Sequence, residues 1–467
     1  MRTRGPRVGV AQRTLRDRLS LSAAVPLLVL VLGVVTYHEV YTGYRTDTPV
    51  RSDGEGYYAY LPAYLLDHDP GFVKVVRDHI RPAYASLPNM SPSWFGFSAQ
   101  PSGTWLDKYG VGEALLTLPF FAIGHAVATI DGASANGYSG PEVFASGLAA
   151  IVYTALALVA MRSVLRRWFP DWAVAATLIA ITFGTSLFHY ATYDSLFSHA
   201  YAFFAVALML LAGLRWYDRP QSWPRALAVG AAAGLVADIR LTNIVLLIAV
   251  PLLGVGSVRT FRARRALLWQ QRVKVLAAGA AALLVFMPQA ITWYLSTGHW
   301  IVRPYPGESF DFLHPHLIET LIWLQPHGVL PYAPVLIFAF AGLAWAWVRR
   351  RDIALPVTAA FLPFWYLLSA WYDWSYADSF GHRGFVDVLP LLALPLAYAF
   401  ASIRTRWLRT ASMALAGAMV AATIMLMIAY WQYRISGNGT DWSGYISVFR
   451  HPHLLLHPNL VSLLTQP

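Results

Sequence analysis

Residues 141–161 read PEVFASGLAAIVYTALALVAM, and Arg162, Arg166 and Arg167 follow within the next few positions. After Glu142 this stretch contains no charged side chain. About 20 consecutive apolar residues suffice for an α-helix to cross the hydrocarbon core of a bilayer. Basic residues gather at the cytoplasmic ends of membrane helices. The stretch therefore predicts a membrane-spanning helix whose C-terminal end faces the cytoplasm.

Further stretches of the same kind occur along the whole chain. Of its 467 residues, 57% are hydrophobic and 13% are charged, and the mean hydropathy is +0.47. That composition excludes an ordinary soluble domain. We predict an all-α, polytopic membrane helix bundle of about 11 transmembrane helices, forming a single membrane domain over residues 1–433 with a tail at 434–467. The remaining predicted spans are 21–40, 173–191, 196–214, 226–239, 241–257, 275–296, 329–348, 353–371, 387–403 and 410–433.

The basic residues predict the orientation of these helices. If the N-terminus is cytoplasmic and the spans alternate, the inner segments hold 24 of the 35 Lys and Arg residues. Every inner segment is then basic, as the positive-inside rule requires. The net charge of +11 does not indicate nucleic-acid binding, because the arginines lie between apolar spans. The inner segments are 1–20, 162–172, 215–225, 258–274, 349–352 and 404–409.

One apolar stretch is placed outside the membrane by the same rule. Residues 113–130 (EALLTLPFFAIGHAVATI) are apolar enough to span, but a span here would invert every later loop. We therefore predict an interfacial or shallow re-entrant helix within a long first extracytoplasmic loop, 42–140. The same loop is expected to carry juxtamembrane helices near 56–67 and 72–81 and an irregular stretch at 86–107. The other long outer segments are 297–328, 372–386 and the tail.

The first loop contains paired acidic residues directly beyond the first span. Asp53 and Glu55 lie in RSDGEGYYAYLP. A partly desolvated carboxylate at a membrane boundary can serve as a general base. Asp53 also stands where a helix N-cap would stand, and the spacing alone favours the cap.

Other ionisable residues also gather at the predicted outer ends of spans. Such residues are functional candidates, although each has a plain structural alternative. A lysine or arginine at this depth can bind phosphate or anchor a helix at the interface, and an acidic residue can form a structural ion pair, for instance Asp238 with Arg240. The candidates are Lys108 and Tyr109, Asp194 and His199, Asp238 and Arg240, and His382 and Arg383.

The order of these motifs resembles the GT-C superfamily of membrane glycosyltransferases. The likeness is to bacterial members related to the protein O-mannosyltransferases and the lipid A aminoarabinose transferases, and it runs from about residue 21 to about residue 403. The sequence series is RSDGEGYYAYLP, KYGVGEALLTLPFF, YDSLFSHAYAFF, DIRLTNIVLL, GVLPYAPVL and FGHRGFVDVLPLLALPL.

The resemblance implies roles for particular residues. Asp53 matches the catalytic Asp of the first loop, with Glu55 and Asp194 as further acidic candidates. Here Gly54 separates Asp53 from Glu55, whereas relatives often have adjacent acidic residues. Lys-Tyr-Gly at 108–110 replaces the Lys-Pro-Pro of the aminoarabinose enzymes. The implied donor-phosphate ligands are Lys108, Arg383, His382 and Arg240, and the implied substrate-binding residues are Tyr57, Tyr58, Tyr109 and His199.

The implied activity is an inverting transfer of a hexose or pentose from a polyprenyl-phosphate donor. The acceptor would be a hydroxyl of an envelope glycan, lipid or protein, on the outer side of a bacterial cytoplasmic (inner) membrane. No cofactor is expected, and a metal is not required although the sequence leaves one open. Two other classes stay open at this point: an envelope polysaccharide polymerase or ligase, and a transporter. The sequence names neither the sugar, nor the acceptor, nor the oligomeric state.

Overall fold

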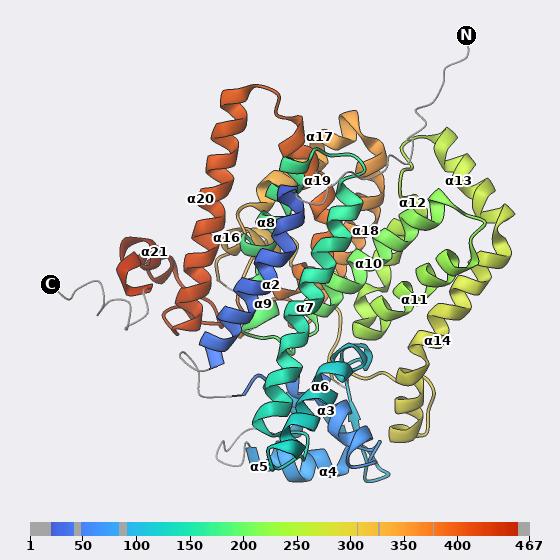
Figure 1. Ribbon diagram of the computed structural model, residues 1–467, viewed down its shortest axis with the longest axis vertical. Coiled ribbons are helices and arrows are strands. Elements are labelled where there is room, and N and C mark those ends of the chain that lie inside the picture. The colour runs from blue at the N-terminus through green and yellow to red at the C-terminus, as the bar shows by residue number, and fades with distance from the viewer. Residues whose placement is uncertain are drawn as a thin grey trace.

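The computed structural model describes residues 20–41, 48–83, 91–305, 307–325, 327–376 and 378–455. Nearly all the elements are helices (Figure 1). The longer ones are α2 (Leu21–Glu39), α3 (Asp53–Leu65), α6 (Gly112–Ile130), α7 (Gly140–Leu165), α8 (Asp171–Phe183), α10 (His199–Asp218), α11 (Trp223–Ile239), α13 (Val258–Gln270), α14 (Arg272–Thr297), α17 (Leu336–Arg349), α18 (Arg351–Ala370), α19 (Leu389–Ser402), α20 (Arg406–Trp431) and α21 (Trp442–Arg450).

Short elements complete the described chain. The short α-helices are α4 (Val73–Val75), α5 (Arg81–Ala83), α9 (Leu187–Thr192), α12 (Ala249–Leu252), α15 (Glu319–Ile322) and α16 (Val329–Tyr332). A π-helix, η2, spans Val76–Ile80, and 3-10 helices are η3 (Pro92–Phe95), η4 (Leu241–Ile248), η5 (Arg383–Val388) and η6 (Pro452–Leu455). The two strands are β1 (Phe97–Ala99) and β2 (Trp105–Asp107).

The predicted all-α membrane bundle is confirmed. Within the described residues, eight helical stretches are long and apolar enough to cross a membrane, and shorter apolar helices occupy 171–183, 241–252 and 336–349. Helix α6 is one of the eight, so its length and composition do not decide whether it crosses. The predicted placement of 113–130 on the outer side stays a prediction.

Three predicted spans are not single α-helices. The expected helix at 241–257 is the 3-10 helix η4 followed by the short α12, which ends at Leu252, and the other two are broken. The expected helix at 173–191 is broken between α8 and α9, where a Cβ on Gly184 would lie 2.6 Å from the Ala180 carbonyl oxygen. The expected helix at 329–348 is divided into α16 and α17 around Pro334, because proline cannot donate to the preceding turn. Hydropathy alone did not reveal these breaks, since both stretches stay apolar throughout.

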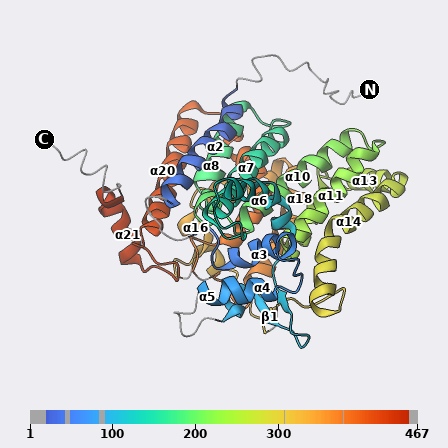
Figure 2. The same ribbon diagram turned by 60° about the horizontal axis from the view of Figure 1, so that its bottom comes forward.

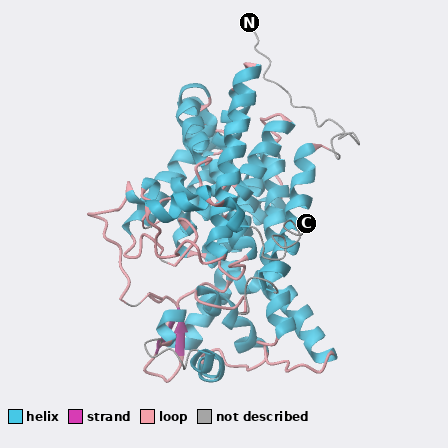
Figure 3. Ribbon diagram, turned by 90° about the vertical axis from the view of Figure 1, so that its left-hand side faces the viewer, coloured by secondary structure: helices cyan, strands magenta, loops and turns pink. Residues whose placement is uncertain are grey.

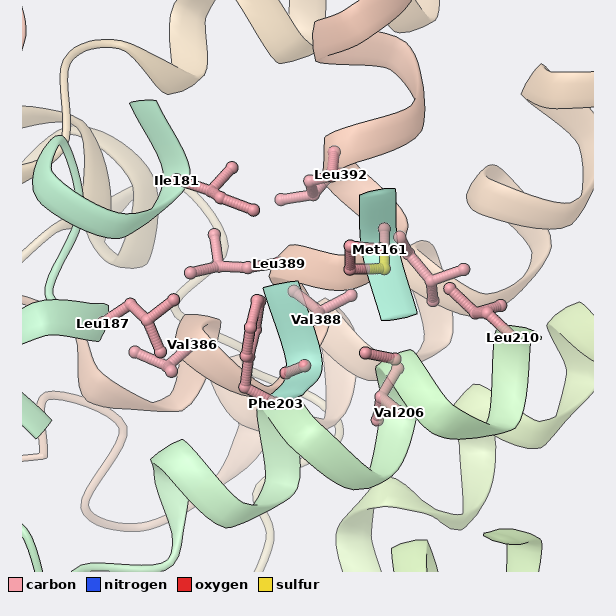
Figure 4. Close-up of a cluster of buried hydrophobic side chains, with 14 of the residues drawn as sticks. Met161, Ile181, Leu187, Phe203, Val206, Leu210, Val386, Val388, Leu389 and Leu392 are labelled. Carbon is pink, nitrogen blue, oxygen red and sulfur yellow. The ribbon is translucent and has the colours of Figure 1, made fainter. Parts of the chain in front are cut away.

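The centre of the bundle is built from helices that are apolar on every side. Helices α10 and α19 are mostly buried, whereas α14 and α20 are mostly exposed within the chain and leave apolar faces for lipid. Figure 4 shows the core between α10 and α19, where Phe203 and Val206 of α10 meet Leu389 and Leu392 of α19, with Met161 of α7 alongside. This central packing fixes the positions at which α10 begins and η5 leads into α19.

Helices α11 and α14 lie against each other through small residues. A Cβ on Gly230 would lie 1.9 Å from the Ala278 carbonyl oxygen, and one on Gly234 would lie 2.5 Å from that of Ala282. Small residues four apart allow two membrane helices to approach closely. The close approach brings the C-terminal end of α11 beside the outer half of α14.

The segment predicted to be the first outer loop forms a compact cap at one end of the bundle. Helices α3, α4 and α5 lie at the bottom of Figure 1, and the turned view in Figure 2 shows α4 between α5 and the lower end of α14. The two strands lie at the end of the molecule opposite the N-terminus (Figure 3). The predicted helices near 56–67 and 72–81 are present as α3 and as the short run from α4 to α5.

The expectation that 86–107 is irregular is wrong for part of residues 91–107. Residues 84–90 lie outside the described residues. The described part contains η3 and an antiparallel pair in which Phe97 faces Asp107. Gly103, with φ +83°, occupies the turn between the strands, where a side chain would be strained. A strand pair this short leaves too little alternation to be recognised from sequence.

Helix α6 runs antiparallel to the N-terminal part of α7. The Tyr153 hydroxyl donates to the Leu116 carbonyl oxygen (3.0 Å), and a Cβ on Gly124 would touch Glu142 at 2.7 Å. Two further helices were not predicted. Helix α13 lies in the basic segment 258–274, and α21 lies in the predicted outer tail.

Substituting Gly230 with Ala should destabilise the bundle, because the added methyl would overlap the Ala278 backbone. The cost is expected to be about 1–3 kcal/mol, measured as a lower thermal unfolding midpoint in detergent. Gly279→Ala is the matched control, since no atom lies within 4 Å of a Cβ there. Equal midpoints for the two variants would contradict the close packing of α11 on α14.

Candidate functional site

Asp53 is the first residue of α3, and its side chain does not cap that helix. Ser52 occupies the N-cap position with φ 49° and makes no side-chain capping hydrogen bond. The Asp53 carboxylate instead accepts a hydrogen bond from the Tyr109 hydroxyl (2.7 Å) and pairs with Arg383 Nη2 (3.1 Å). The capping interpretation of Asp53 is therefore wrong, because the carboxylate contacts Tyr109 and Arg383 and not the backbone of α3.

Glycines bring the segment that carries Lys108 and Tyr109 to this carboxylate. A Cβ on Gly110 would lie 1.9 Å from the Asp238 carbonyl oxygen, so only glycine allows this contact with the end of α11. A Cβ on Gly56 would overlap the Tyr109 ring. Because both positions lack side chains, the Tyr109 ring fits between α3 and α11 with its hydroxyl on Asp53.

The charges around Asp53 favour its ionised form. Burial by itself raises the pKa of Asp53, but Arg383, then Lys108, and the hydrogen bond from Tyr109 outweigh burial and hold this pKa below its usual value. The carboxylate is therefore ionised at neutral pH. Its pairing stabilises the folded protein at pH values above the ordinary pKa of Asp. This stabilisation is lost as the pH falls through the lower pKa that Asp53 has in the folded protein. The side chain retains 21% exposure, so solvent and substrate can reach it.

Lys108 is paired with an acidic residue that the sequence did not single out. Its Nζ donates to Glu308 Oε1 (2.9 Å), and it lies 5.5 Å from the centre of the Tyr305 ring. Both partners come from the outer segment between α14 and α15. Lys108 therefore faces the site with its charge held by a residue of a neighbouring loop.

Arg240 belongs to a third ion pair, and the expected pairing with Asp238 is wrong. Its Nε lies 3.2 Å from Asp387 Oδ2, while His199 Nδ1 lies 2.9 Å from Asp387 Oδ1 and Asn243 donates to Oδ2 (3.0 Å). Asp387 was missed as a candidate. The available signal was a carboxylate within the otherwise apolar run FVDVLPLLALPL, where an unpaired charge would be costly.

Asp194 is engaged in a separate network. It pairs closely with Arg51, and His189 Nε2 donates to it (2.7 Å) while His189 Nδ1 accepts from the Trp431 indole (2.9 Å). Burial opposes ionisation, but Arg51 and then His189 prevail, and the pKa of Asp194 is well below its usual value. These contacts join the chain before α3 to α9 and α20, which is a structural role for Asp194.

The remaining predicted residues divide by location. The Tyr57 ring lies on the Tyr109 ring with centroids 4.4 Å apart, next to Asp53. Tyr58 instead donates to the Gly137 carbonyl oxygen, and Glu55 is buried two positions beyond Asp53. His382 adjoins Arg383, but burial, with a smaller contribution from His327, lowers its pKa to about 3. A neutral imidazole there supplies no positive charge for a phosphate.

A narrow cleft adjoins Lys108 and Tyr109 on the side away from α3. It lies between the 108–110 segment, the end of α11 and the outer half of α14. Its lining residues are Lys108, Tyr109, Gly110, Ala237, Asp238, Ile239, Arg240, Leu241, Phe286, Gln289, Trp293 and Tyr305. The structure thus places an accessible carboxylate and two basic side chains, Lys108 and Arg383, around one point, with Arg240 lining the adjoining cleft. Within the described residues, no group of three or more His, Asp and Glu side chains could hold a metal ion.

No protein-family model and no curated protein matches the chain. Among solved structures it is similar to the oligosaccharyltransferase of Archaeoglobus fulgidus. The apo form has 14% identity and a TM-score of 0.46 over 95% of this chain and 60% of that one. The complex of this enzyme, AglB, with an inhibitory peptide and a dolichol-phosphate has 13% identity and a TM-score of 0.46 over 92% and 59%. The complex with Zn and sulfate has 14% identity and a TM-score of 0.48 over 92% and 57%.

These similarities concern the arrangement of the helices. The chain spans about 60% of the length of that enzyme. With identities of 13–14% and TM-scores below 0.5, the similarities say nothing about activity. The chemistry of this chain is therefore argued from its own site.

Asp194→Asn should destabilise the protein, because it leaves Arg51 buried without its counter-ion. The expected loss is about 3–5 kcal/mol of unfolding free energy, measured by thermal or chemical unfolding in detergent. Asp218→Asn is the control, since Asp218 pairs with Arg167 at an exposed position and should change stability by about 1 kcal/mol or less. Normal stability of Asp194→Asn together with lost activity would overturn the structural role.

Proposed function

We propose that the protein is an inverting glycosyltransferase using a polyprenyl-phosphate-linked hexose or pentose. The acceptor would be a hydroxyl of an envelope glycan, lipid or protein on the extracytoplasmic side of a bacterial cytoplasmic membrane. The observation that carries the proposal is the Asp53 carboxylate, held by Tyr109 and Arg383 with Lys108 nearby, at one end of a membrane bundle. A base beside cations, at the membrane boundary, suits an acceptor hydroxyl and a lipid phosphate together.

The proposed reaction is a single displacement at the anomeric carbon. Asp53 takes the proton of the acceptor hydroxyl as its oxygen bonds to that carbon. The bond from carbon to the phosphate oxygen breaks on the opposite side, and the polyprenyl phosphate leaves with the electron pair. Lys108 and Arg383 stabilise the charge that develops on this leaving group. Because one displacement occurs, the configuration at the carbon is inverted.

Donor binding and base strength are coupled in this arrangement. In the free protein, Arg383 is paired with Asp53 and Lys108 with Glu308. A phosphate competes for both cations, because it offers several charge-assisted hydrogen bonds at once. When Arg383 turns to the phosphate, Asp53 loses its main counter-ion and its pKa rises. The carboxylate then becomes a stronger base only when the donor is in place.

The surroundings of the site suit a lipid-linked donor. Helix α6 begins directly after the Lys108 segment, and its exposed side chains Leu115, Ile123 and Val127 offer an apolar face leading away from the site. A polyprenyl chain can lie on such a face within the bilayer while its phosphate reaches Lys108. The proposed chemistry uses side-chain cations and a side-chain base, so it requires neither cofactor nor metal.

Lys108→Ala and Arg383→Ala should each weaken binding of polyprenyl phosphate. Removing one charge-assisted contact costs about 1.5–3 kcal/mol, or roughly 10- to 100-fold in affinity. Glu308→Gln should strengthen binding, because it removes the carboxylate that competes for Lys108. Binding is measured on protein in nanodiscs, and transfer is measured with defined polyprenyl-phosphate sugars and envelope fractions as acceptors.

Lys74→Ala provides the control for charge removal. Lys74 is an exposed lysine of the same outer region, 3.8 Å from Asp67, and its loss should leave donor affinity unchanged. If Lys108→Ala and Arg383→Ala both fold and bind polyprenyl phosphate with wild-type affinity, the two residues do not bind the phosphate and serve as interface anchors. Absence of transfer with every lipid-phosphate sugar, together with transport of a solute, would replace the proposal by the transporter alternative. Transfer of whole lipid-linked glycans would favour a polymerase or ligase.

A further inference from the structure

The cleft beside Lys108 contains buried polar atoms that the proposed displacement does not use. Asp238, at the end of α11, is 1% exposed, and neither of its carboxylate oxygens has a hydrogen-bond partner among the described residues. Trp293, on α14, is 5% exposed, and its indole Nε1 likewise lacks a described acceptor. Both residues line the same cleft. Leaving such groups unpaired is costly, so an incoming ligand that pairs with them gains affinity.

The surrounding contacts hold these residues in place. The Gln289 side chain, one turn before Trp293 on α14, accepts from the Val111 backbone N–H (2.7 Å) and ties α14 to the segment after Lys108. On the other side, Gly110 packs on the Asp238 backbone. The cleft is therefore built by the close packing of three segments, and its polar groups are positioned before any ligand enters.

The signs of the charges separate two parts of the site. Lys108 and Arg383 are cations and suit a phosphate, whereas the buried, unpaired Asp238 carboxyl group supplies no positive charge to bind one. Asp238 needs a partner that donates hydrogen bonds, and the Trp293 N–H needs an acceptor. A hydroxyl does both. Neighbouring hydroxyls on one ring can pair with both carboxylate oxygens and with the indole, and a sugar attached to a phosphate at Lys108 would place its ring here.

We propose that Asp238 and Trp293 bind hydroxyl groups of the donor's sugar ring and so select the sugar that is transferred. This inference rests on the proposed function, because it takes the phosphate of the donor to lie at Lys108. The cleft is narrow in the free protein, with Tyr305 in its lining and Glu308 on Lys108. When the phosphate displaces Glu308, Lys108, which lines the cleft, is released from its partner, and its movement would widen the cleft for the ring.

The test compares two ligands on the same protein in nanodiscs. Polyprenyl phosphate without a sugar measures the phosphate site alone, and a panel of polyprenyl-phosphate monosaccharides measures the added effect of the ring. Wild-type protein should bind at least one sugar-bearing lipid about tenfold more tightly than the bare lipid phosphate. Asp238→Asn and Trp293→Phe should lose most of this difference while keeping their affinity for the bare lipid phosphate.

Trp216→Phe is the matched control for the indole. Trp216 is also a buried tryptophan whose Nε1 lacks a described partner, but it lies on α10 outside the cleft. It should retain the full preference for the sugar-bearing lipid. If Asp238→Asn fails to fold, Trp293→Phe still decides the matter, with unfolding measured in parallel.

The outcomes separate this inference from the proposed function. Wild-type protein that binds bare lipid phosphate but gains nothing from any sugar would overturn the sugar site and leave the phosphate site standing. A preference that survives in both Asp238→Asn and Trp293→Phe would also overturn it, as would an equal loss in Trp216→Phe. Wild-type protein that binds neither lipid would overturn the proposed function itself.

Discussion

The contact between Asp53 and Arg383 joins parts of the chain that are far apart in sequence. Asp53 begins α3 in the predicted first outer loop, and Arg383 begins η5, directly before α19 enters the bundle. Tyr109 adds the segment that leads into α6 through its hydrogen bond to the same carboxylate. The outer cap and the central helices are thereby held together at one charged point. Any displacement of the cap would separate a buried or half-buried charge from its partner, which is strongly unfavourable.

The same rule governs the other charges of the outer region. Arg240 is compensated by Asp387, Lys108 by Glu308 and Arg51 by Asp194. Arg51–Asp194 and Arg240–Asp387 are the more buried pairs, and they position helix ends. Asp53–Arg383 and Lys108–Glu308 retain more exposure and surround the point where a substrate can enter. In the proposed reaction, an anionic donor would exchange partners with these two more exposed pairs while the more buried pairs keep the framework fixed.

The sequence predicted the helices well because their signal is local. A long apolar run such as 141–161 with arginines at one end needs no distant partner to be recognised. The partners of the polar residues depend on the fold, and there the sequence was less informative. Asp238 and Arg240 are near neighbours in the sequence, yet Arg240 pairs with Asp387 and Asp238 is left for the cleft. Asp53 had the spacing of a cap, but its carboxylate points to residues from other segments. Glu308 carried no signal, since an acidic residue in a polar loop is unremarkable until the lysine opposite is known.

Asp53 is the base of the proposed displacement, and substituting it with Asn separates this role from a structural one. Asn at this position keeps the size of the side chain and an acceptor for the Tyr109 hydroxyl, but it cannot take a proton. The measurement is single-turnover transfer from a defined polyprenyl-phosphate sugar by Asp53→Asn, alongside its affinity for the donor. The account predicts a folded protein that still binds donor and transfers roughly 10²- to 10⁴-fold more slowly. Near-normal transfer by Asp53→Asn would contradict it.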